Sequence, residues 1–339
     1  MRPAEREGPV RIGGPSGAQD HRRFEHHALG TVNCISLRDA DPRRPEETDA
    51  AAAAAFQLLD RIEDQLSRFR PESEVSLLNT LGFDRPIAVG KALFGLLQAA
   101  KSAWEETGGA FDPTIGPLMD AWGFPRGPAR VPPGDEIETL LAARGMDLVE
   151  LDTEARTARF VRPGVAIEPR SIGKGYAVDR AAELLQGRGI APGAVNSGTS
   201  TLRFWGEPPG GGPWQVEVAH PKRPQEAIAI LEAAAGSIST SGAYQDRFFH
   251  EGIEYGHILD PRTGRPASGK VRSATVWTED ALRGDILSTA IYVLGADEGA
   301  RLLAKEARAS ALVVEEDPTS WGGLSVRVFH GRTPGFGRR

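Results

Sequence analysis

Apolar positions along the first third of the chain follow two clear periods. Residues 32–37 alternate apolar and polar side chains, which is typical of a strand with one buried face. Residues 45–69 place apolar side chains every three or four positions and predict a long amphipathic helix, which Pro71 would end. A similar helix is predicted over 91–107, and Ser73 suits the N-cap of a short helix between the two.

The rest of the chain mixes strands and helices without strict alternation. We expect helices over 137–144 and 172–185, around Asp285 and over 297–307, and strands over 148–151, 157–161, 201–205, 214–219, 271–276, 311–314 and 324–328. Residues 206–213 are predicted to form the tip of a hairpin that joins two of these strands. This order favours an α+β fold over a doubly wound parallel sheet.

Composition narrows the functional classes. The 339 residues are 40% apolar and 25% charged, which is typical of a globular protein. The net charge is -6 and no basic stripe is present, which argues against nucleic-acid binding. The single cysteine, Cys34, excludes an internal disulfide and a Cys-rich zinc site.

Long apolar runs are missing from the sequence. Residues 1–25 contain none, so we expect a disordered N-terminal tail and no signal peptide. No stretch reaches the length of a transmembrane helix, and Cys34 does not follow an apolar leader as a lipid-anchor cysteine would. We therefore expect a cytoplasmic protein without a membrane anchor.

Residues 256–266 combine several chemically active groups in one turn-rich segment. Asp260-Pro261 and Thr263-Gly264 are turn dipeptides, so we expect a rigid loop that presents His257 and its neighbours. Binding and catalytic groups often lie on such loops. The alternative is a structural turn with solvated charges.

Asp285 and Thr289 form a second candidate pair. They are four residues apart, so on a helix both oxygens project from one face. A carboxylate and a hydroxyl, completed by backbone carbonyls and water, suit Mg²⁺. The alternative is that Asp285 caps the helix and Thr289 packs inward.

Two glycine-containing segments could also line a site. Gly173-Lys174-Gly175 at a helix start offers backbone N–H groups and an ammonium to an anion, but it lacks the remaining residues of a P-loop. Residues 109–118 contain too many Gly and Pro residues for regular structure, yet they are apolar. That segment either lines a site or is a covered connection.

Five segments in one order resemble the ApbE family of FAD:protein FMN transferases: 67–79, 109–118, 172–179, 240–266 and 285–289. The resemblance extends over about residues 26–330. It implies a two-lobed α+β fold with mixed or antiparallel sheets flanked by helices, and FAD in the cleft between the lobes. It also implies a folded domain over 26–331 and a C-terminal tail over 332–339.

The resemblance also implies roles for individual residues. Mg²⁺ on the FAD diphosphate would be held by Asp285, Thr289 and the backbone carbonyl of Gly173. Catalytic roles fall on Lys174, on Asp285 and on His257, which we expect to be the general base, with Asp285 as the alternative base. The positions implied to contact FAD are Phe69, Ser73, Asn79, Phe111, Asp112, Thr114, Lys174, Gly175, Asn196, Gly198, Ser241, Gly242, His257, Asp260 and Thr263.

The implied reaction transfers FMN from FAD to a Ser or Thr hydroxyl of an acceptor flavoprotein and releases AMP. The alternatives are an FAD diphosphatase, with water as the nucleophile, and a flavin-binding protein without turnover. The sequence departs from the family pattern at several positions. Arg170 and Ser171 replace two glycines, Thr199 replaces another, Leu29 replaces a frequent Met, and Ala243 replaces a frequent Asp.

Overall fold

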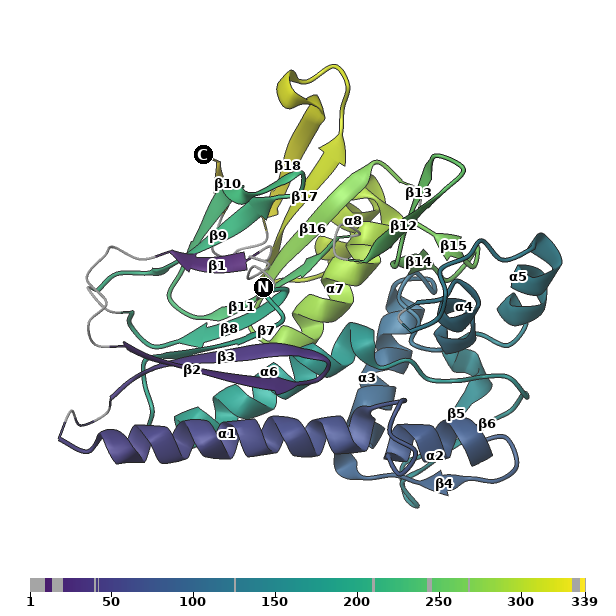
Figure 1. The fold of residues 1–339 in the computed structure, drawn as a ribbon, viewed down its shortest axis with the longest axis horizontal. Helices are drawn as coiled ribbons and strands as arrows, with labels where there is room; N and C mark the ends of the chain where they lie inside the picture. The colour runs from purple at the N-terminus through teal and green to yellow at the C-terminus, as the bar shows by residue number, and fades with distance from the viewer. Residues whose placement is uncertain are drawn as a thin grey trace.

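The computed structural model describes residues 10–13, 21–39, 41, 43–124, 126–208, 211–242, 246–267, 269–330 and 336–338. Its centre is an eight-stranded sheet in the order β18-β17-β16-β11-β8-β7-β3-β2, in which every pair is antiparallel (Figure 1). Its strands are β2 (His21–Ala28), β3 (Thr31–Arg38), β7 (Gly193–Ser197), β8 (Thr201–Trp205), β11 (Gly236–Ser241), β16 (Val271–Thr278), β17 (Ala309–Glu316) and β18 (Leu324–His330).

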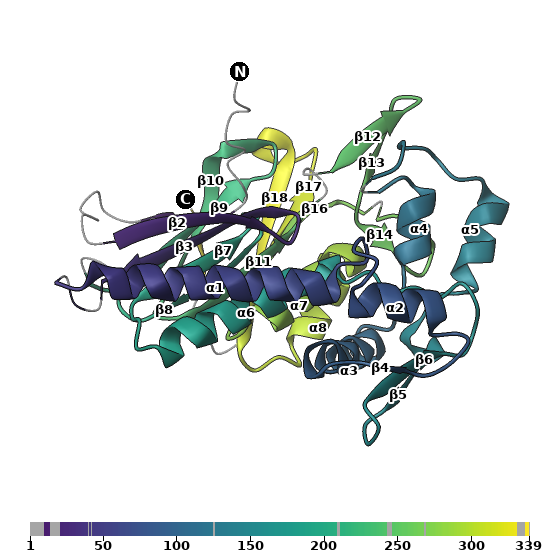
Figure 2. The ribbon, with the colours of Figure 1, turned by 60° about the horizontal axis from the view of Figure 1, so that its bottom comes forward.

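Four helices cover one face of this sheet, with α6 and α7 side by side (Figure 2). They are α1 (Pro45–Leu66), α6 (Arg170–Gly187), α7 (Ala281–Leu294) and α8 (Ala296–Leu303). The sequence explains α1 directly, because Pro45 suits the first helical turn and its apolar stripe is buried. That stripe packs against α6 and the sheet and belongs to the largest hydrophobic core, which also includes buried side chains between residues 75 and 160.

A smaller antiparallel sheet packs on the opposite face, in the order β1-β9-β10-β19. Its strands are β1 (Val10–Gly13), β9 (Trp214–His220), β10 (Arg223–Ala233) and β19 (Phe336–Arg338). A second core joins the two sheets, in which the Phe204 and Trp214 rings lie 5.9 Å apart between centroids.

The second lobe contains short helices and hairpins beside the main sheet (Figure 2). These elements are α2 (Glu74–Leu81), β4 (Ile87–Ala88), α3 (Lys91–Glu106), α4 (Gly116–Ala121), α5 (Gly134–Leu141), β5 (Val149–Asp152), β6 (Thr157–Phe160), β12 (Arg247–His250), β13 (Ile253–Gly256), β14 (Leu259–Asp260) and β15 (Arg265–Pro266). Two short 3₁₀ segments, Met146–Leu148 and Trp321–Gly323, complete the described elements. A third core joins α4 and α5 to the β12–β13 and β14–β15 hairpins.

The predicted hairpin over 201–219 is wrong. β8 pairs with β7 and β11 in the large sheet, whereas β9 pairs with β1 and β10 in the small sheet. The connection between β8 and β9 therefore crosses from one sheet to the other. Side-chain alternation identifies a strand but does not identify its hydrogen-bonding partner, which is why the sequence did not reveal this crossing.

Three other expectations differ from the structure. β1 pairs with β9 and β2 begins at His21, so two strands use residues expected in a disordered N-terminal tail. β19 pairs with β10 inside the expected C-terminal tail. The segment 109–118, expected to be irregular, ends in α4, because Pro117 is accommodated in the first helical turn. None of the described helices has the length and apolar character needed to cross a membrane.

Candidate active site

The contact between α6 and α7 is built around the carboxylate of Asp285, which is 7% exposed. Its Oδ2 accepts a hydrogen bond from the Gly175 N–H at 2.7 Å, and its Oδ1 accepts one from the Thr201 hydroxyl at 2.8 Å. Burial raises the pKa of Asp285, although the Lys174 charge and these hydrogen bonds oppose that shift. Asp285 does not cap α7, because Asp280 occupies the N-cap and accepts from the Arg283 N–H.

Glycine is required where the two helices cross. A Cβ on Gly175 would lie 2.5 Å from the Ala281 carbonyl oxygen and 2.9 Å from Asp285 Oδ2. One turn later, Asp179 accepts hydrogen bonds from the N–H groups of Ala281 and Leu282, both at 2.9 Å. Asp179 therefore fixes the start of α7 against α6.

Lys174 connects α6 to the β7–β8 connection. Its Nζ donates to the Ser200 hydroxyl oxygen at 2.7 Å, and the Ser200 carbonyl accepts from the Thr240 N–H of β11. Burial lowers the pKa of Lys174, and the nearby Asp285 opposes the shift. In the same connection, Gly198 and Thr199 have φ values of 58° and 63°. Thr199, being β-branched, is strained in this left-handed conformation.

Hydroxyl groups surround the helix face that carries Asp285. Thr289 is half-buried one turn further along α7, and its Oγ1 lies 3.2 Å from the Ser241 hydroxyl at the end of β11. Ser241 also contacts Ser288 at 3.0 Å. Gly242 follows and is buried, whereas Ala243 lies outside the described residues.

His257 lies at the start of the turn-rich segment that follows β13. Its Nδ1 is 3.1 Å from the carbonyl oxygen of Asp246, which also accepts the His257 backbone N–H at 3.0 Å. A carbonyl only accepts, so Nδ1 carries the proton and Nε2 keeps its lone pair. Burial lowers the pKa of His257 to about 4, and the charges of Arg170 and Lys174 contribute to the shift. The imidazole is therefore neutral at pH 7.

The remaining polar groups of this segment serve the turn itself. Both carboxylate oxygens of Asp260 accept hydrogen bonds from the Arg262 guanidinium, at 2.9 Å each. Thr263 is exposed and its hydroxyl contacts the Asp260 carbonyl at 3.4 Å. These contacts support the structural interpretation for Asp260 and Thr263, whereas the Nε2 atom of His257 is not used in them.

The predicted FAD-contacting residues in the loop after α3 are buried, and the polar ones form hydrogen bonds with nearby groups. Asp112 Oδ1 accepts from both the N–H and the hydroxyl of Thr114, and the Thr114 oxygen accepts from the Gly145 N–H at 2.6 Å. Phe111 is part of the main core. Burial raises the pKa of Asp112 to about 6. In this structure these side chains stabilise the loop between α3 and α4.

Of the predicted FAD-contacting residues around α2, two hold the local structure and one does not. Ser73 caps α2 by accepting from the Ser76 N–H at 2.9 Å, as expected. Asn79 bonds both the N–H and the carbonyl of Ile167, which fixes the segment before α6. Phe69 is different, because it is half-buried and its ring contacts guanidinium groups.

Two guanidinium groups already contact the Phe69 ring. Arg68 lies 5.1 Å and Arg126 4.0 Å from the ring centroid. On β7, Asn196 is half-buried, and its side-chain oxygen has no hydrogen-bond partner. The Asn196 oxygen is therefore a group that a ligand could contact, whereas the Phe69 ring already has cationic partners.

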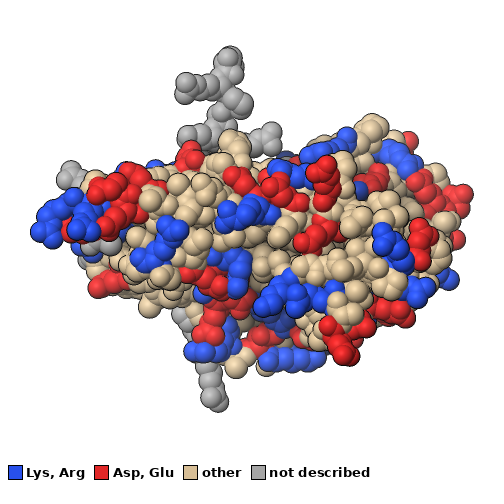
Figure 3. Space-filling view, turned by 90° about the horizontal axis from the view of Figure 1, so that it is seen from below, with Lys and Arg blue, Asp and Glu red and all other residues tan. Residues whose placement is uncertain are grey.

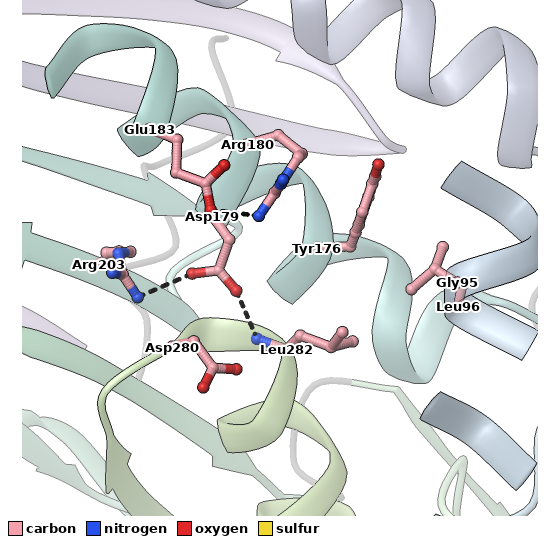
Figure 4. A pocket seen from close by; sticks show the side chains of 9 residues that line it. All are labelled: Gly95, Leu96, Tyr176, Asp179, Arg180, Glu183, Arg203, Asp280 and Leu282. Atoms are coloured by element: carbon pink, nitrogen blue, oxygen red, sulfur yellow. Dashed lines mark hydrogen bonds and ion pairs between the residues drawn. The ribbon is translucent and has the colours of Figure 1, made fainter. Parts of the chain in front are cut away.

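A pocket of about 320 Å³ lies between α3, α6 and α7 and contains none of the predicted site residues (Figure 4). Asp179 points into it and pairs with Arg203 at 3.0 Å. Burial raises the pKa of Asp179 to about 6. Asp179 therefore lines this pocket and also fixes the start of α7, whereas Asp285, Lys174 and His257 do not line it. Basic and acidic side chains are interspersed over the face in Figure 3, which offers no continuous basic surface.

Four residues of the cluster were missed by sequence reasoning. Asp179, Ser200, Thr201 and Asp246 act through contacts between segments far apart in the chain. Only the hydroxyl-rich run at 199–201 gave a local signal, and such a run is common in ordinary loops.

Comparison with known proteins shows which family the chain belongs to. The sequence matches the ApbE family over residues 29–313. The chain belongs to the ApbE family. An FAD:protein FMN transferase of Vibrio cholerae is 34% identical over 246 residues, covering 72% of this chain and 73% of that protein. One from Klebsiella pneumoniae is 32% identical over 301 residues, covering 88% and 91%.

Solved ApbE structures share this fold over most of the chain. The ApbE protein of Thermotoga maritima has a TM-score of 0.80 and 31% identity, covering 91% of this chain and 97% of that one. The flavin transferase ApbE of Vibrio cholerae has a TM-score of 0.80 and 27% identity over the same shares. The expected family, its α+β fold and a transferase enzyme are confirmed.

Proposed function

We propose that this ApbE protein transfers FMN from FAD to a Ser or Thr hydroxyl of an acceptor flavoprotein, with release of AMP. The observation that carries the proposal is the Asp285 carboxylate, which is fixed by Gly175 and Thr201 beside the Lys174 ammonium. Relatives covering most of the chain bear the name FAD:protein FMN transferase. The reaction needs charge neutralisation on two phosphates and a positioned nucleophile.

The oxygen groups of the cluster suit Mg²⁺. Among the described residues no group of three or more His, Cys, Asp and Glu side chains could hold a metal ion. The proposed donor set therefore combines one carboxylate with hydroxyl and carbonyl oxygens. Asp285, Thr289 and the carbonyl of Gly173 would hold the ion. Apart from its chain neighbours and the backbone of its own helix, no atom lies within 4 Å of a Cβ built on Gly173, which leaves space there. Bound Mg²⁺ would supply Lewis acidity at the diphosphate.

Lys174 and the first turn of α6 would bind the phosphate oxygens. The ammonium and the backbone N–H groups offer positive charge where negative charge develops on the AMP leaving group. Burial lowers the pKa of Lys174 in the free protein. A bound diphosphate would raise it again, because an adjacent anion favours the ammonium form.

His257 would act as the general base. Its Nε2 lone pair is available, whereas both oxygens of Asp285 already accept hydrogen bonds. The His257 pKa of about 4 in the free protein lies below the near-neutral value that suits a general base. A bound diphosphate would raise that pKa, because an adjacent anion favours the imidazolium form. Nε2 would take the proton of the acceptor hydroxyl as that oxygen attacks the FMN phosphorus. The P–O bond to AMP then breaks, and AMP leaves with the bonding electron pair.

Incubation with FAD and Mg²⁺, with and without an acceptor flavoprotein, tests the proposal. We expect AMP release only with the acceptor, together with flavin covalently attached to it. Release of AMP and FMN without acceptor would instead identify an FAD diphosphatase. FAD binding without any release of AMP would identify a flavin-binding protein.

A further inference from the structure

The β12–β13 hairpin projects from the second lobe, and its base holds His257 (Figure 2). His257 follows β13, and its backbone N–H donates to the Asp246 carbonyl at 3.0 Å, which extends the hairpin ladder by one residue pair. The same carbonyl lies 3.1 Å from His257 Nδ1. The hairpin therefore positions the imidazole that we propose as the general base.

Aromatic side chains anchor one face of this hairpin. Phe248 and Tyr255 stack with 5.3 Å between their ring centroids, and both rings lie against Trp122, at 6.4 Å and 5.4 Å. Phe124 lies 5.7 Å from Phe248 and 6.4 Å from the His257 ring. An isolated two-stranded hairpin is only marginally stable, so this packing against the third core holds the hairpin in place.

The tip of the hairpin presents apolar side chains to solvent. Phe249 is 65% exposed and Ile253 56%, the two highest values among the large apolar side chains that the structure describes. Phe249 lies opposite Glu254 in the ladder, on the face that points away from the aromatic stack. Arg247 lies 5.9 Å from the Phe249 ring centroid and pairs with Glu254 at 3.0 Å. Exposed apolar side chains with a polar rim are typical of protein-binding surfaces.

We infer that the hairpin tip, formed by Phe249 and Ile253, is the docking surface for the acceptor flavoprotein, an inference that rests on the proposed function. That reaction requires an acceptor hydroxyl at His257, so a surface close to His257 must bind the acceptor. Phe249 is three residues from Asp246 along an extended chain, which is about 10 Å. A standard interface buries about 800 Å² of each partner. An acceptor that contacts the tip would therefore also cover the His257 end of the hairpin.

The charge of the tip favours a protein partner over a lipid surface. Glu251 lies in the turn between Phe249 and Ile253, and its side chain is exposed. The negative potential of an anionic membrane would repel this carboxylate, whereas protein interfaces combine an apolar centre with a polar rim. We therefore expect the acceptor to carry apolar side chains beside its modified Ser or Thr.

The test compares Phe249→Ser with the wild-type protein in FMN transfer, at saturating FAD and Mg²⁺ and with varied concentrations of an unmodified acceptor flavoprotein. We expect the KM for the acceptor to rise about 10-fold, because a few large apolar side chains contribute most of the binding energy of an interface. The kcat at saturating acceptor should not change, nor should the Kd for FAD from flavin fluorescence quenching. Fluorescence anisotropy of the labelled acceptor measures its binding directly.

Phe83→Ser is the matched control. Phe83 is also an exposed phenylalanine, and it follows α2, which lies at the opposite end of the second lobe from the hairpin (Figure 1). Its substitution should leave the KM for the acceptor unchanged. Ile253→Ser should raise that KM in the same direction as Phe249→Ser. Thermal unfolding of each variant checks that the fold is retained.

Three results would overturn the inference: an unchanged KM for the acceptor in Phe249→Ser, an equal increase in Phe83→Ser, or a loss confined to kcat. Two others would overturn it by showing a different occupant, each with an unchanged KM. A wild-type dimer that Phe249→Ser dissociates in size-exclusion chromatography would show that a second copy of the chain covers the tip. Phe249-dependent flotation with phosphatidylcholine–phosphatidylglycerol vesicles would show that the tip binds lipid.

Failure of the docking inference differs from failure of the proposed function. FMN transfer by the wild type with the same KM in Phe249→Ser refutes only the docking surface. Phe249-dependent binding of the acceptor without any transfer by the wild type refutes only the proposed function.

Discussion

Asp285 combines a structural and a chemical role in one buried carboxylate. It accepts hydrogen bonds that hold α6 and β8 to α7, and it is the only carboxylate in the donor set proposed for Mg²⁺. Burying an ionised carboxylate is costly, which is why burial raises its pKa. A bound Mg²⁺ would offset that cost. We therefore expect the Asp285 carboxylate to be more favourable when Mg²⁺ is bound with FAD than in the free protein.

Asp285→Ala should abolish Mg²⁺-dependent transfer while the fold is retained. Loss of the charged ligand should lower the rate on the order of 10²-fold or more, since metal assistance contributes several kcal/mol. AMP release at limiting and saturating Mg²⁺ measures this. The control is Asp280→Ala, which removes the N-cap of α7 and should cost about 0.5–2 kcal/mol of stability with activity retained. Wild-type activity of Asp285→Ala at limiting Mg²⁺ would exclude the metal assignment.

The pH dependence of stability should reveal the buried state of His257. Its pKa is about 4 in the folded protein, against about 6.5 in the unfolded chain. Between these values the unfolded chain binds more protons, so the stability contributed by neutral His257 is complete above about pH 6.5 and is lost as pH falls towards 4.

Urea unfolding of wild type and His257→Gln from pH 7 to pH 4.5 measures this contribution. The wild type should lose stability relative to the variant as pH falls. Asp112 and Asp179, whose pKa values are raised to about 6, have the opposite effect, but both proteins contain them and their contribution cancels. Parallel stability curves would show that the imidazole titrates normally.

At the scale of elements, the site depends on the close approach of α6 to α7. Gly175 permits it, since any Cβ there would meet the Ala281 carbonyl and the Asp285 carboxylate. Asp179 then fixes the N-terminus of α7 through two backbone N–H groups. The helix spacing therefore sets the position of Asp285 relative to Lys174.

Gly175→Ala should separate the two helices. We expect a loss of about 1–3 kcal/mol in the free energy of unfolding, together with reduced transfer, because the added methyl group overpacks the contact. Gly173→Ala is the matched change two residues earlier, where nothing lies within 4 Å. It should gain up to about 1 kcal/mol from helix propensity and retain its backbone carbonyl. Equal unfolding free energies for the two variants would contradict the role of the contact.

The sequence predicted elements better than it predicted their partners. The long helix from Pro45, the N-cap at Ser73 and the Gly295 end of α7 were all readable, because each depends on local spacing or local backbone preference. The sheet crossing after β8 was not readable, since it depends on pairing between distant segments.

The same distinction applies to the candidate site. The helical spacing of Asp285 and Thr289 correctly placed both on α7, and Thr289 faces the Ser241 hydroxyl. The partners Thr201 and Asp246 come from other elements and give no local pattern. The family resemblance supplied the order of the segments, and only the structure supplied their contacts.

At the scale of the whole molecule, three hydrophobic cores hold different parts of the structure together. The first holds the large sheet to its helices and extends through α2, α3 and β4 to β6 of the second lobe. The second joins the two sheets, and the third joins α4 and α5 to the hairpins next to His257. Trp122 is central to the third core. Its Nε1 donates to the Gly264 carbonyl at 2.8 Å, and its ring lies 5.4 Å from that of Tyr255.

Trp122→Phe should show that this third core positions His257. The variant keeps an aromatic ring but leaves the buried Gly264 carbonyl without its donor, which should cost about 1–3 kcal/mol of stability. We expect a lower kcat with little change in FAD affinity, because His257 and Gly264 belong to one short segment. Transfer assays and FAD titrations on the purified variant measure both. An unchanged kcat in a destabilised variant would limit the third core to a structural role.

The four-stranded sheet has a consequence for biosynthesis. Its two middle strands, β9 and β10, are flanked by β1 near the start of the described chain and by β19 near its end. During translation β9 and β10 leave the ribosome long before β19, so one edge of their hairpin stays unpaired until β19 emerges. Open strand edges are templates for aggregation, and late long-range pairing is slow. The nascent chain is therefore most exposed to misassembly just before residues 336–338 emerge.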